Sequence, residues 1–492
     1  MERLSGLDAT FLYMETPSLH MHVSMAAVFD PTTVPGGYSF DKVRALVGER
    51  LVRAPVFRRR LVEVPLRLGH PYWVEDDGFD IDYHMRRAAL PSPGGIDELA
   101  EFVGDVCSRQ LDRSKPLWEM HIVEGLADGR IAVVTKIHHC TIDGVSGAEL
   151  LAELFDLEAD PTPRPVPDEL PNAGGMPSDL TLLAQAMVER ATSPLRITRL
   201  AWKTGKAVLE MRKTRQSSGS GHMALPLTTP RTSLNQAITP HRAVAFSTIS
   251  LDDVKRVKNA LGTTVNDVVL AVCTGALRRY LIDGDELPDE PLVVTVPVSV
   301  ATDRQSANKV SAMFVSLPCR IDDPVERLGT IREGTKGAKE EHKALGAEVL
   351  LDWAEHSTPN VFSAAARAYT RYRLADRHRP IQSLVISNVP GPDFPLYLGG
   401  AELVAGFPLG PVMDGAGLNI TVMSYRGVLN WGLMACRETV PGVSRLGAYI
   451  PDALEELLAA AGLDPGTPVG IAPGQDHRKA ERRKPSPVAT GG

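Results

Sequence analysis

The sequence predicts an α/β protein made of two lobes with a helical bridge between them. A chain of 492 residues is long enough to bury the cores of two domains or lobes. Predicted strands and helices alternate in both halves of the chain, which is typical of α/β architecture. Between the halves, residues 160–175 are rich in proline and charge, as expected of a connector.

The first lobe is expected to cover residues 1–159. Runs of β-branched and apolar residues predict its strands, and apolar residues at helical spacing predict its helices. The strands are predicted at 20–29, 120–124 and 131–137, and the helices at 39–51, 96–111 and 147–157. Asp128 and Gly129 predict the hairpin turn between the last two strands.

Residues 160–240 are expected to form the connector and a basic helical bridge. Within 190–215 there are eight lysines and arginines and one acid, Glu210, with Trp202 and several leucines among them. Such a helix can lie in a lipid headgroup layer, where its cations face anionic lipid. It can equally pack on the protein's own surface, so the sequence leaves the lipid contact of this helix open.

The second lobe is expected to cover residues 241–470, and its elements follow the same two patterns. The strands are predicted at 243–250, 292–300, 311–317, 384–389, 418–425 and 428–434, and the helices at 251–261, 263–277, 325–345, 347–375 and 440–461. Thr264 or Asn266 is expected to cap the second of these helices. Residues 471–492 are basic and rich in proline and glycine, which predicts a disordered tail.

Charge, cysteine use and hydropathy exclude several classes of protein. A net charge of −7 leaves no overall positive field for phosphates, so a nucleic-acid partner is not expected. The five cysteines form no C-x-x-C pair, which favours reduced thiols in a cytoplasmic protein without a structural zinc site. No signal peptide is evident and no apolar run has the length of a membrane span, so any membrane contact is expected to be peripheral.

The strongest chemical signal lies where the strand predicted at 131–137 ends. His138 and His139 follow it directly, and Asp143 and Gly144 supply a turn. A strand end is a rigid support, and imidazole is the side chain best suited to accept a proton near neutral pH. The alternative is a pair of structural histidines. Four specified residues in seven favour the catalytic interpretation over that alternative.

Other familiar motifs are absent or incomplete. Gly144-Val-Ser146-Gly-Ala148 has alanine where a nucleophile elbow needs glycine, and Gly329 to Lys336 only partly resembles a phosphate loop. The pair His20-x-His22 is a weak metal signal, and we interpret both residues as structural. We therefore expect neither a metal nor a nucleotide cofactor.

A reaction driven by histidine, with no evident protein nucleophile, is the chemistry that remains. His139 is expected to act as the general base while a hydroxyl or amine attacks a carbonyl, which is acyl transfer without an acyl-enzyme. Asp143 is expected to brace the loop through an ion pair with an arginine, because an unpaired buried carboxylate is costly. The sequence does not identify that arginine.

The motif His138-His139-x-x-x-Asp143-Gly144 at a strand end resembles the signature of acyltransferases related to chloramphenicol acetyltransferase and to peptide-synthetase condensation domains. Three further features narrow the resemblance to the bacterial wax ester synthase/diacylglycerol acyltransferase family. These features are the opening Leu4-Ser-Gly-Leu-Asp8-Ala-Thr-Phe11, the triplet Pro116-Leu-Trp118 and the pair Asn266-Asp267. The strand end at Asn388 fits this family as well. The resemblance extends from Leu4 to about Leu463.

This resemblance implies two chloramphenicol acetyltransferase-like lobes with mixed sheets flanking an interlobe tunnel. Acyl-CoA and a lipid alcohol would enter from opposite faces and meet at His139. The family also implies that His138 and Gly144 support the loop and that Asp143 is chiefly structural. Substrate-binding residues are expected in the second lobe, namely Asn266, Asp267, Ser387 and Asn388. One departure is Ala307-Asn308, where the family often has Gly-Asn.

The function that the resemblance implies is transfer of a long-chain acyl group from acyl-CoA to diacylglycerol, and also to fatty alcohols. Acyl-CoA is then a substrate, and no cofactor is expected. Two alternatives stay open: an acyltransferase with another alcohol or amine acceptor, and a catalytically silent lipid-binding relative. The protein is expected in the cytoplasm, at the inner face of the membrane or on lipid droplets. Acyl chain length and preferred acceptor are not predicted.

Overall fold

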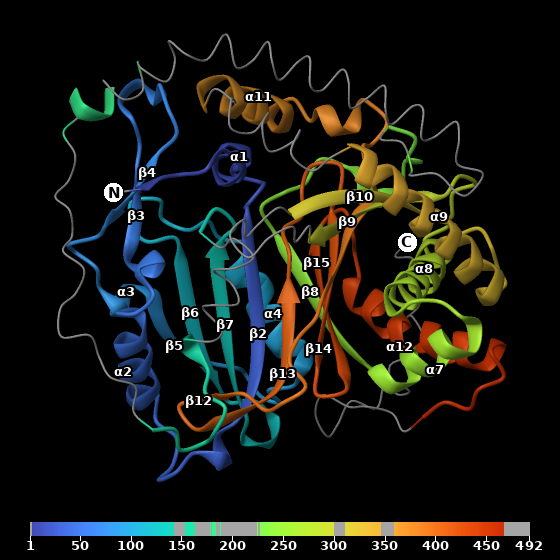
Figure 1. Cartoon of the computed structure of the whole chain (residues 1–492), viewed down its shortest axis with the longest axis horizontal. Coiled ribbons are helices and arrows are strands. Elements are labelled where there is room, and N and C mark those ends of the chain that lie inside the picture. The colour runs from blue at the N-terminus through green and yellow to red at the C-terminus, as the bar shows by residue number, and fades with distance from the viewer. Residues whose placement is uncertain are drawn as a thin grey trace, which may run out of the picture.

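The computed structural model describes residues 2–141, 153–162, 178, 180–183, 187, 224, 227–299, 310–345 and 359–466. Two six-stranded mixed sheets form the centres of two lobes, and helices cover them (Figure 1). This confirms the predicted α/β class with two lobes and mixed sheets. The predictions for residues 147–152, for the basic helix at 190–215, for Ala307-Asn308 and for the tail 471–492 lie outside the described residues.

The first sheet carries the strand that leads to the two histidines. Its order is β12-β13-β2-β7-β6-β5. The four strands from the first lobe are β2 (His22–Asp30), β7 (Ile131–His138), β6 (Trp118–Glu124) and β5 (Met85–Ala89). A small three-stranded sheet lies beside them and contains β1 (Glu2–Arg3), β4 (Tyr72–Glu75) and β3 (Arg59–Val62).

Both faces of the first sheet are buried, because alternate side chains of each strand pack on different helices. Val28 and Val134 pack with α4 (Ile96–Cys107), whereas Phe29 and Ile131 pack with α2 (Phe40–Leu51). The strands therefore read as continuous apolar runs, as buried strands do.

The second sheet has the order β10-β9-β11-β14-β15-β8. Its strands are β8 (Arg242–Ser250), β9 (Leu292–Ser299), β10 (Val310–Leu317), β11 (Leu384–Val389), β14 (Leu418–Tyr425) and β15 (Val428–Cys436). Its helices are α7 (Leu251–Leu261), α8 (Val265–Asp283), α9 (Pro324–Leu345) and α12 (Val443–Ala460). Thr264 is the N-cap of α8, so one of the two proposed caps is confirmed. Most of α8 is buried in the core that this sheet and its helices share.

The lobe boundary at residue 241 is wrong in one respect, because two strands from the second half of the chain belong to the first sheet. They are β12 (Tyr397–Leu398) and β13 (Ala401–Leu409), and β13 pairs antiparallel with β2. The sequence did not predict β13, since Gly406 and Pro408 are residues that weaken a strand signal. The first sheet is therefore completed by residues from the second half.

The two sheets meet closely where β13 passes β15. A Cβ atom added to Gly432 of β15 would lie 2.0 Å from the carbonyl oxygen of Pro408 in β13, and one added to Gly406 would lie 2.8 Å from the Cε atom of Met423. At Gly432 the close atom belongs to the backbone, so only glycine permits this approach, whereas at Gly406 it is the end of a flexible side chain. The junction of the lobes thus depends on small residues at the crossing.

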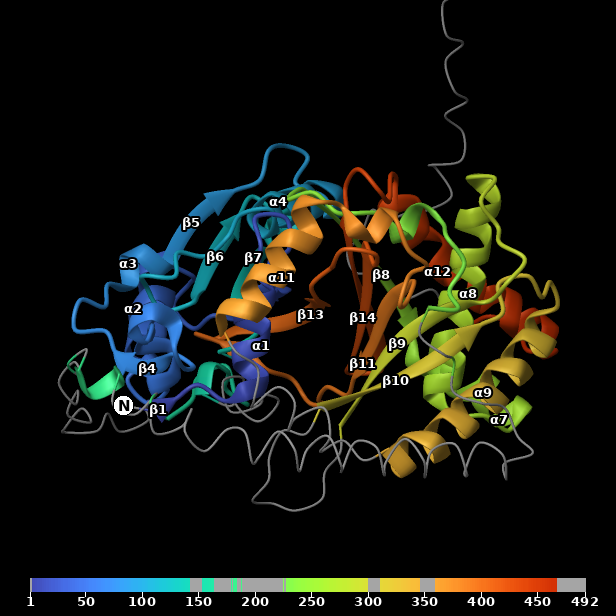
Figure 2. The same ribbon diagram turned by 90° about the horizontal axis from the view of Figure 1, so that it is seen from above.

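Helix α11 (Pro359–Arg371) also crosses between the halves and lies against α1 (Gly6–Met14), as Figure 2 shows. The rings of Tyr13 and Phe362 have centroids 6.4 Å apart, and the side-chain amide of Asn360 donates a hydrogen bond of 2.9 Å to the carbonyl of Leu66. Part of the helix predicted at 347–375 is thereby confirmed, in contact with the first lobe.

Within the described residues, no single helix has the length and apolar character needed to span a membrane. Only α7 and α8 taken together meet those criteria, and they are bent by 105° relative to each other.

Candidate active site

The end of β7 is held on both sides by neighbouring strands. His138 is opposite His22 of β2, and Ile137 is opposite Trp118 of β6. The backbone N–H of His138 donates to the carbonyl of Leu117 at 2.9 Å, and that of His139 donates to the carbonyl of Met21 at 2.7 Å. The chain is therefore fixed through both histidines, as expected for a rigid strand end.

His139 is half-buried, and its ring stacks on Phe11 with centroids 4.0 Å apart and planes at 29°. Phe11 lies on α1, whose first turn is capped by the hydroxyl of Ser5 accepting from the N–H of Asp8. The opening motif thus forms the helix that packs on the imidazole. Burial lowers the pKa of His139 to about 4, so the ring is neutral at pH 7 and can accept a proton.

His138 is buried, and its contacts assign it a supporting role. Its Nδ1 atom accepts a hydrogen bond of 3.1 Å from the N–H of Cys140, so the neutral ring carries its proton on Nε2. The Nε2 atom lies 3.7 Å from Oε2 of Glu15. Because the His138 ring accepts a hydrogen bond from the backbone N–H of Cys140, it fixes the turn that contains His139.

Glu15 is a site residue that the sequence analysis missed. Its carboxylate is buried between two histidines: Nε2 of His138 lies 3.7 Å from Oε2, and Nε2 of His22 lies 3.7 Å from Oε1. The Nε atom of Arg113 donates to Oε2 at 2.7 Å, and the amide of Gln110 donates to Oε1 at 3.4 Å. An anion at this depth needs such partners.

Electrostatics keep Glu15 ionised despite its burial. Burial raises the pKa of the Glu15 carboxyl, but the contacts with His138 and Arg113 lower it by more, and the net shift is downward. Glu15 is also the C-cap of α1, where the helix dipole disfavours an anion. An acid at the C-terminal end of a helix is the one sequence signal that could have marked it.

The pair His20 and His22 is structural in its contacts. The ring nitrogens of His20 lie 2.9 Å from the carbonyl of Pro17 and 3.3 Å from that of Cys107. Burial lowers the pKa of both rings, and that of His22 lies well below its ordinary value. In the part of the chain that the structure describes, no three His, Cys, Asp or Glu side chains are arranged to hold a metal ion.

Asp267 was predicted to bind substrate, but its contacts are those of a structural residue. One carboxylate oxygen accepts from the N–H and hydroxyl of Thr264 at 3.0 and 2.8 Å, which completes a capping box for α8. The other oxygen accepts from the hydroxyl of Thr335 in α9 at 2.8 Å. Both oxygens of this buried residue are thus engaged in contacts within the lobe, and a role of Asp267 in substrate binding stays a prediction. Asn266, its neighbour, is half-buried.

Ser387 and Asn388 lie on β11, opposite Thr421 and Val422 of β14. The other edge of β11 pairs with β9 only at Leu384 and Val385, so this pairing ends before Ser387. Both side chains are half-buried. The described residues show no contact from Asn266, Ser387 or Asn388 to the histidine pair, so their role in substrate binding stays a prediction, as does the tunnel.

Asp143, Gly144 and the Ala307-Asn308 pair lie outside the described residues, and their predicted roles stay predictions.

The part of the site that the structure does bring together comes from three segments of the first lobe. These are the end of β7, the helix α1 with Glu15, and the loop after α4 with Arg113. Fold and site define a two-lobed α/β protein with a neutral histidine at a strand end, which suits general-base chemistry.

Comparison with known proteins identifies the family. The model of the wax ester synthase/diacylglycerol acyltransferase catalytic domain matches residues 4–269, and that of the WS/DGAT C-terminal domain matches residues 306–458. A relative from Mycobacterium tuberculosis strain CDC 1551, named as a diacylglycerol O-acyltransferase, is 42% identical over 463 residues, which cover 93% of this chain and 90% of the relative. Another diacylglycerol O-acyltransferase by name, from strain H37Rv, is 39% identical over 468 residues, which cover 94% of this chain and 97% of the relative.

Solved structures agree with these matches. The wax ester synthase/diacylglycerol acyltransferase from Marinobacter aquaeolei VT8 has a TM-score of 0.67 and 32% identity, covering 94% of this chain and 100% of that one. The starter condensation domain of rhizomide synthetase has a TM-score of 0.52 at 13% identity over 95% of each chain, which shows a shared fold. This chain belongs to the wax ester synthase/diacylglycerol acyltransferase family and is an acyltransferase.

The pKa of His139 predicts how activity depends on pH. Only the neutral ring can accept a proton, so kcat/KM should hold steady below the ordinary histidine pKa of 6.5 and fall only as the pH approaches about 4. The measurement is kcat/KM from about pH 8 down to about pH 4.5, with activity re-measured after return to neutral pH. An acid limb centred near pH 6.5 would contradict the burial of His139 described here.

Replacing Glu15 by glutamine should reduce kcat by at least about tenfold. The neutral amide removes the negative charge that faces the Nε2–H of His138 at 3.7 Å. The turn that carries His139 is then less firmly oriented, and a misplacement of about 1 Å at a reacting group can cost about 100-fold. The matched control is Glu124→Gln, which removes a carboxylate that pairs with Arg87 at the sheet edge. The measurements are kcat, KM and thermal melting for both variants. A native kcat in Glu15→Gln, with only the melting temperature lowered, would reduce Glu15 to a stabilising residue.

Proposed function

We propose that this protein transfers a long-chain acyl group from acyl-CoA to the free hydroxyl of diacylglycerol, forming triacylglycerol, and that it also forms wax esters with long-chain alcohols. Family membership supports the reaction class, and the names of the M. tuberculosis relatives support the acceptor. The observation that carries the proposal is the neutral, half-buried imidazole of His139, fixed at the end of β7 and stacked on Phe11.

In the proposed reaction His139 acts as the general base. Its Nδ1 atom is enclosed in the protein, so we assign the proton of the neutral ring to Nδ1 and the acceptor hydroxyl to Nε2. As the hydroxyl oxygen attacks the thioester carbonyl, its proton passes to Nε2. When the tetrahedral intermediate collapses, the C–S bond breaks and the imidazolium returns the proton to the sulfur of CoA. General-base assistance of this kind typically raises the reaction rate by about 10²- to 10⁴-fold.

Cys140 is the nearest thiol in sequence to His139, and its environment supports direct transfer over an acyl-enzyme. Its side chain is buried, and burial raises the pKa of the thiol far above its ordinary range. A thiolate is the nucleophilic form, so this cysteine is poorly suited to attack a thioester. We therefore propose no covalent intermediate and no resident cofactor, with acyl-CoA as a substrate.

The lipid acceptor implies a place at a lipid surface. Diacylglycerol resides in membranes, so we propose that the protein works in the cytoplasm, peripherally bound at the inner face of the membrane. The alternatives remain an acyltransferase with another alcohol or amine acceptor, and a silent relative that binds lipid. The charged, partnered state of Glu15 behind the histidines favours an active enzyme over the silent one.

His139→Ala should lower ester formation by at least about 100-fold, because no other described group is placed to take the acceptor proton. The assay follows labelled acyl-CoA incubated with diacylglycerol, with hexadecanol and with no acceptor. The matched control is Cys140→Ser, which keeps the N–H that bonds to His138 and should retain activity.

Equal product from His139→Ala and the native protein would overturn the general-base role. Release of CoA without ester would favour a different acceptor. Loss of activity in Cys140→Ser, with folding intact, would point to a covalent route instead.

A further inference from the structure

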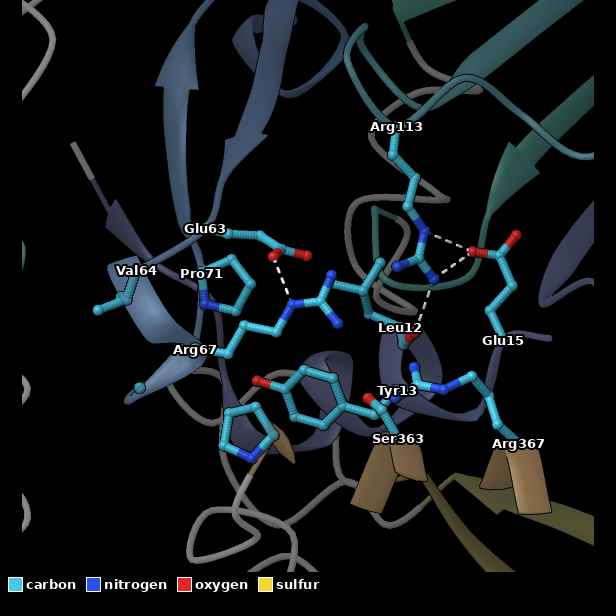
Figure 3. Close-up of a pocket in the computed structure, with 12 residues that line it drawn as sticks. Leu12, Tyr13, Glu15, Glu63, Val64, Arg67, Pro71, Arg113, Ser363 and Arg367 are labelled. Carbon is cyan, nitrogen blue, oxygen red and sulfur yellow. Dashed lines mark hydrogen bonds and ion pairs between the residues drawn. The ribbon is translucent and has the colours of Figure 1, made fainter. Parts of the chain in front are cut away.

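A small cavity lies on the side of α1 that faces α11, where the two halves of the chain meet. Its volume is about 80 Å³, and α1 contributes Leu12 and Tyr13 to its lining. Three arginines reach it from different segments: Arg67 from the loop after β3, Arg113 from the loop after α4 and Arg367 from α11. Figure 3 shows their guanidinium groups directed toward the same space.

The charges around this cavity leave a positive surplus. Glu63 accepts from Nε of Arg67 at 2.7 Å, and Glu15 accepts from Nε of Arg113 at 2.7 Å. Arg367 has no ion-pair partner within the described residues. Arg67 pairs with Glu63 through its Nε atom, so its terminal N–H donors remain available (Figure 3). Arg113 is more fully engaged, since its Nη2 atom also donates to Glu15 and to the carbonyl of Leu12. One net positive charge and several donors therefore face the cavity.

The backbone that presents Arg67 is in an unusual conformation. Leu66 and Arg67 have φ angles of 57° and 51°, in the left-handed region that non-glycine residues rarely occupy. The amide of Asn360, at the start of α11, holds the carbonyl of Leu66 at 2.9 Å. Strained residues of this kind concentrate at ligand sites, where surrounding contacts maintain them. Ser363, nine-tenths buried on α11, adds a hydroxyl to the lining.

We propose that the Arg67–Arg113–Arg367 cavity binds a single phosphomonoester group, and that the group is the 3′-phosphate of the acyl-CoA substrate. Planar guanidinium groups match phosphate oxygens through paired N–H donors. The volume holds several water molecules and so admits one phosphate group, with the rest of the ligand outside. The identity of the ligand rests on the proposed acyl-CoA reaction, whereas the phosphate site itself does not.

The position of the cavity fits a substrate whose phosphate and thioester are far apart. Helix α1 places Phe11 against His139 and presents Leu12 and Tyr13 to the cavity. The phosphate site and the reaction centre are thus separated by one helix. CoA carries its thiol at the end of a long flexible arm, so its phosphate must be held away from the histidine.

The first experiment measures binding without turnover. Adenosine 3′,5′-bisphosphate and adenosine 5′-monophosphate are titrated calorimetrically into the native protein, Arg367→Ala and Arg371→Ala. Arg371 is exposed one turn further along α11, outside the cavity lining, and is the matched control. Arg367→Ala should weaken binding of the bisphosphate at least tenfold, Arg371→Ala should not, and the monophosphate should bind more weakly to the native protein. Equal binding by native and Arg367→Ala protein would overturn the site.

The second experiment identifies the source of the phosphate. If it is the 3′-phosphate of CoA, Arg367→Ala raises KM for acyl-CoA with kcat unchanged and leaves KM for 3′-dephospho-acyl-CoA as in the native enzyme. In parallel, flotation compares vesicles of phosphatidylcholine with and without phosphatidic acid. If Arg367→Ala no longer binds vesicles with phosphatidic acid, while its KM for acyl-CoA equals that of the native enzyme, the CoA assignment is overturned in favour of a lipid headgroup. If the native protein transfers no acyl group, the calorimetric result still decides whether the phosphate site exists.

Discussion

The buried carboxylate of Glu15 is the constraint on which the geometry of the site depends. A charged group at this depth is tolerated only with several partners, and Arg113, Gln110, His138 and His22 surround it. Through His138 the constraint reaches the N–H of Cys140 and hence the turn that carries His139. The reactive histidine is therefore positioned by a chain of polar contacts that begins on α1 and the loop after α4.

Hydrophobic packing complements this polar chain and ties the site to the whole molecule. Phe11 covers the His139 ring from α1, and α1 in turn packs on α11 from the second half of the sequence. Strand β13 completes the sheet that contains β7, and α4 packs with residues of both sheets. The two halves cannot separate without exposing this shared core, so the site is a property of the complete fold.

Much of the fold could be predicted because the elements around the site carry strong local patterns. The hairpin β14–β15, the strand β7 and the helix α8 with its Thr264 cap lie where apolar periodicity and capping chemistry place them. Strand β13 could not be predicted, since Gly406 and Pro408 weaken its pattern and its partner β2 lies far away in sequence. Local patterns do not record which distant edge a strand will join.

The site residues likewise divide into those with a strong local sequence signal and those recognised only from tertiary contacts. The histidine pair was evident because two imidazoles follow an apolar strand, whereas Glu15 gave only a weak signal as an acid at a helix end. Asp267 is the opposite case, because a carboxylate in a recognised motif also serves its own helix as a cap, which the motif alone does not indicate. Side chains that act through tertiary contacts are recognised only once the segments are placed together.

The central claim is that His139 is a neutral imidazole at physiological pH, and nitrogen-15 NMR of histidine-labelled protein tests it directly. The His139 signals are assigned by their loss in His139→Gln, and their shifts are followed from about pH 8 to about pH 5, across the ordinary histidine range. Signals of a neutral ring are expected throughout this range, because burial lowers the pKa of His139 to about 4. A titration of His139 with its midpoint near pH 6.5 would contradict it.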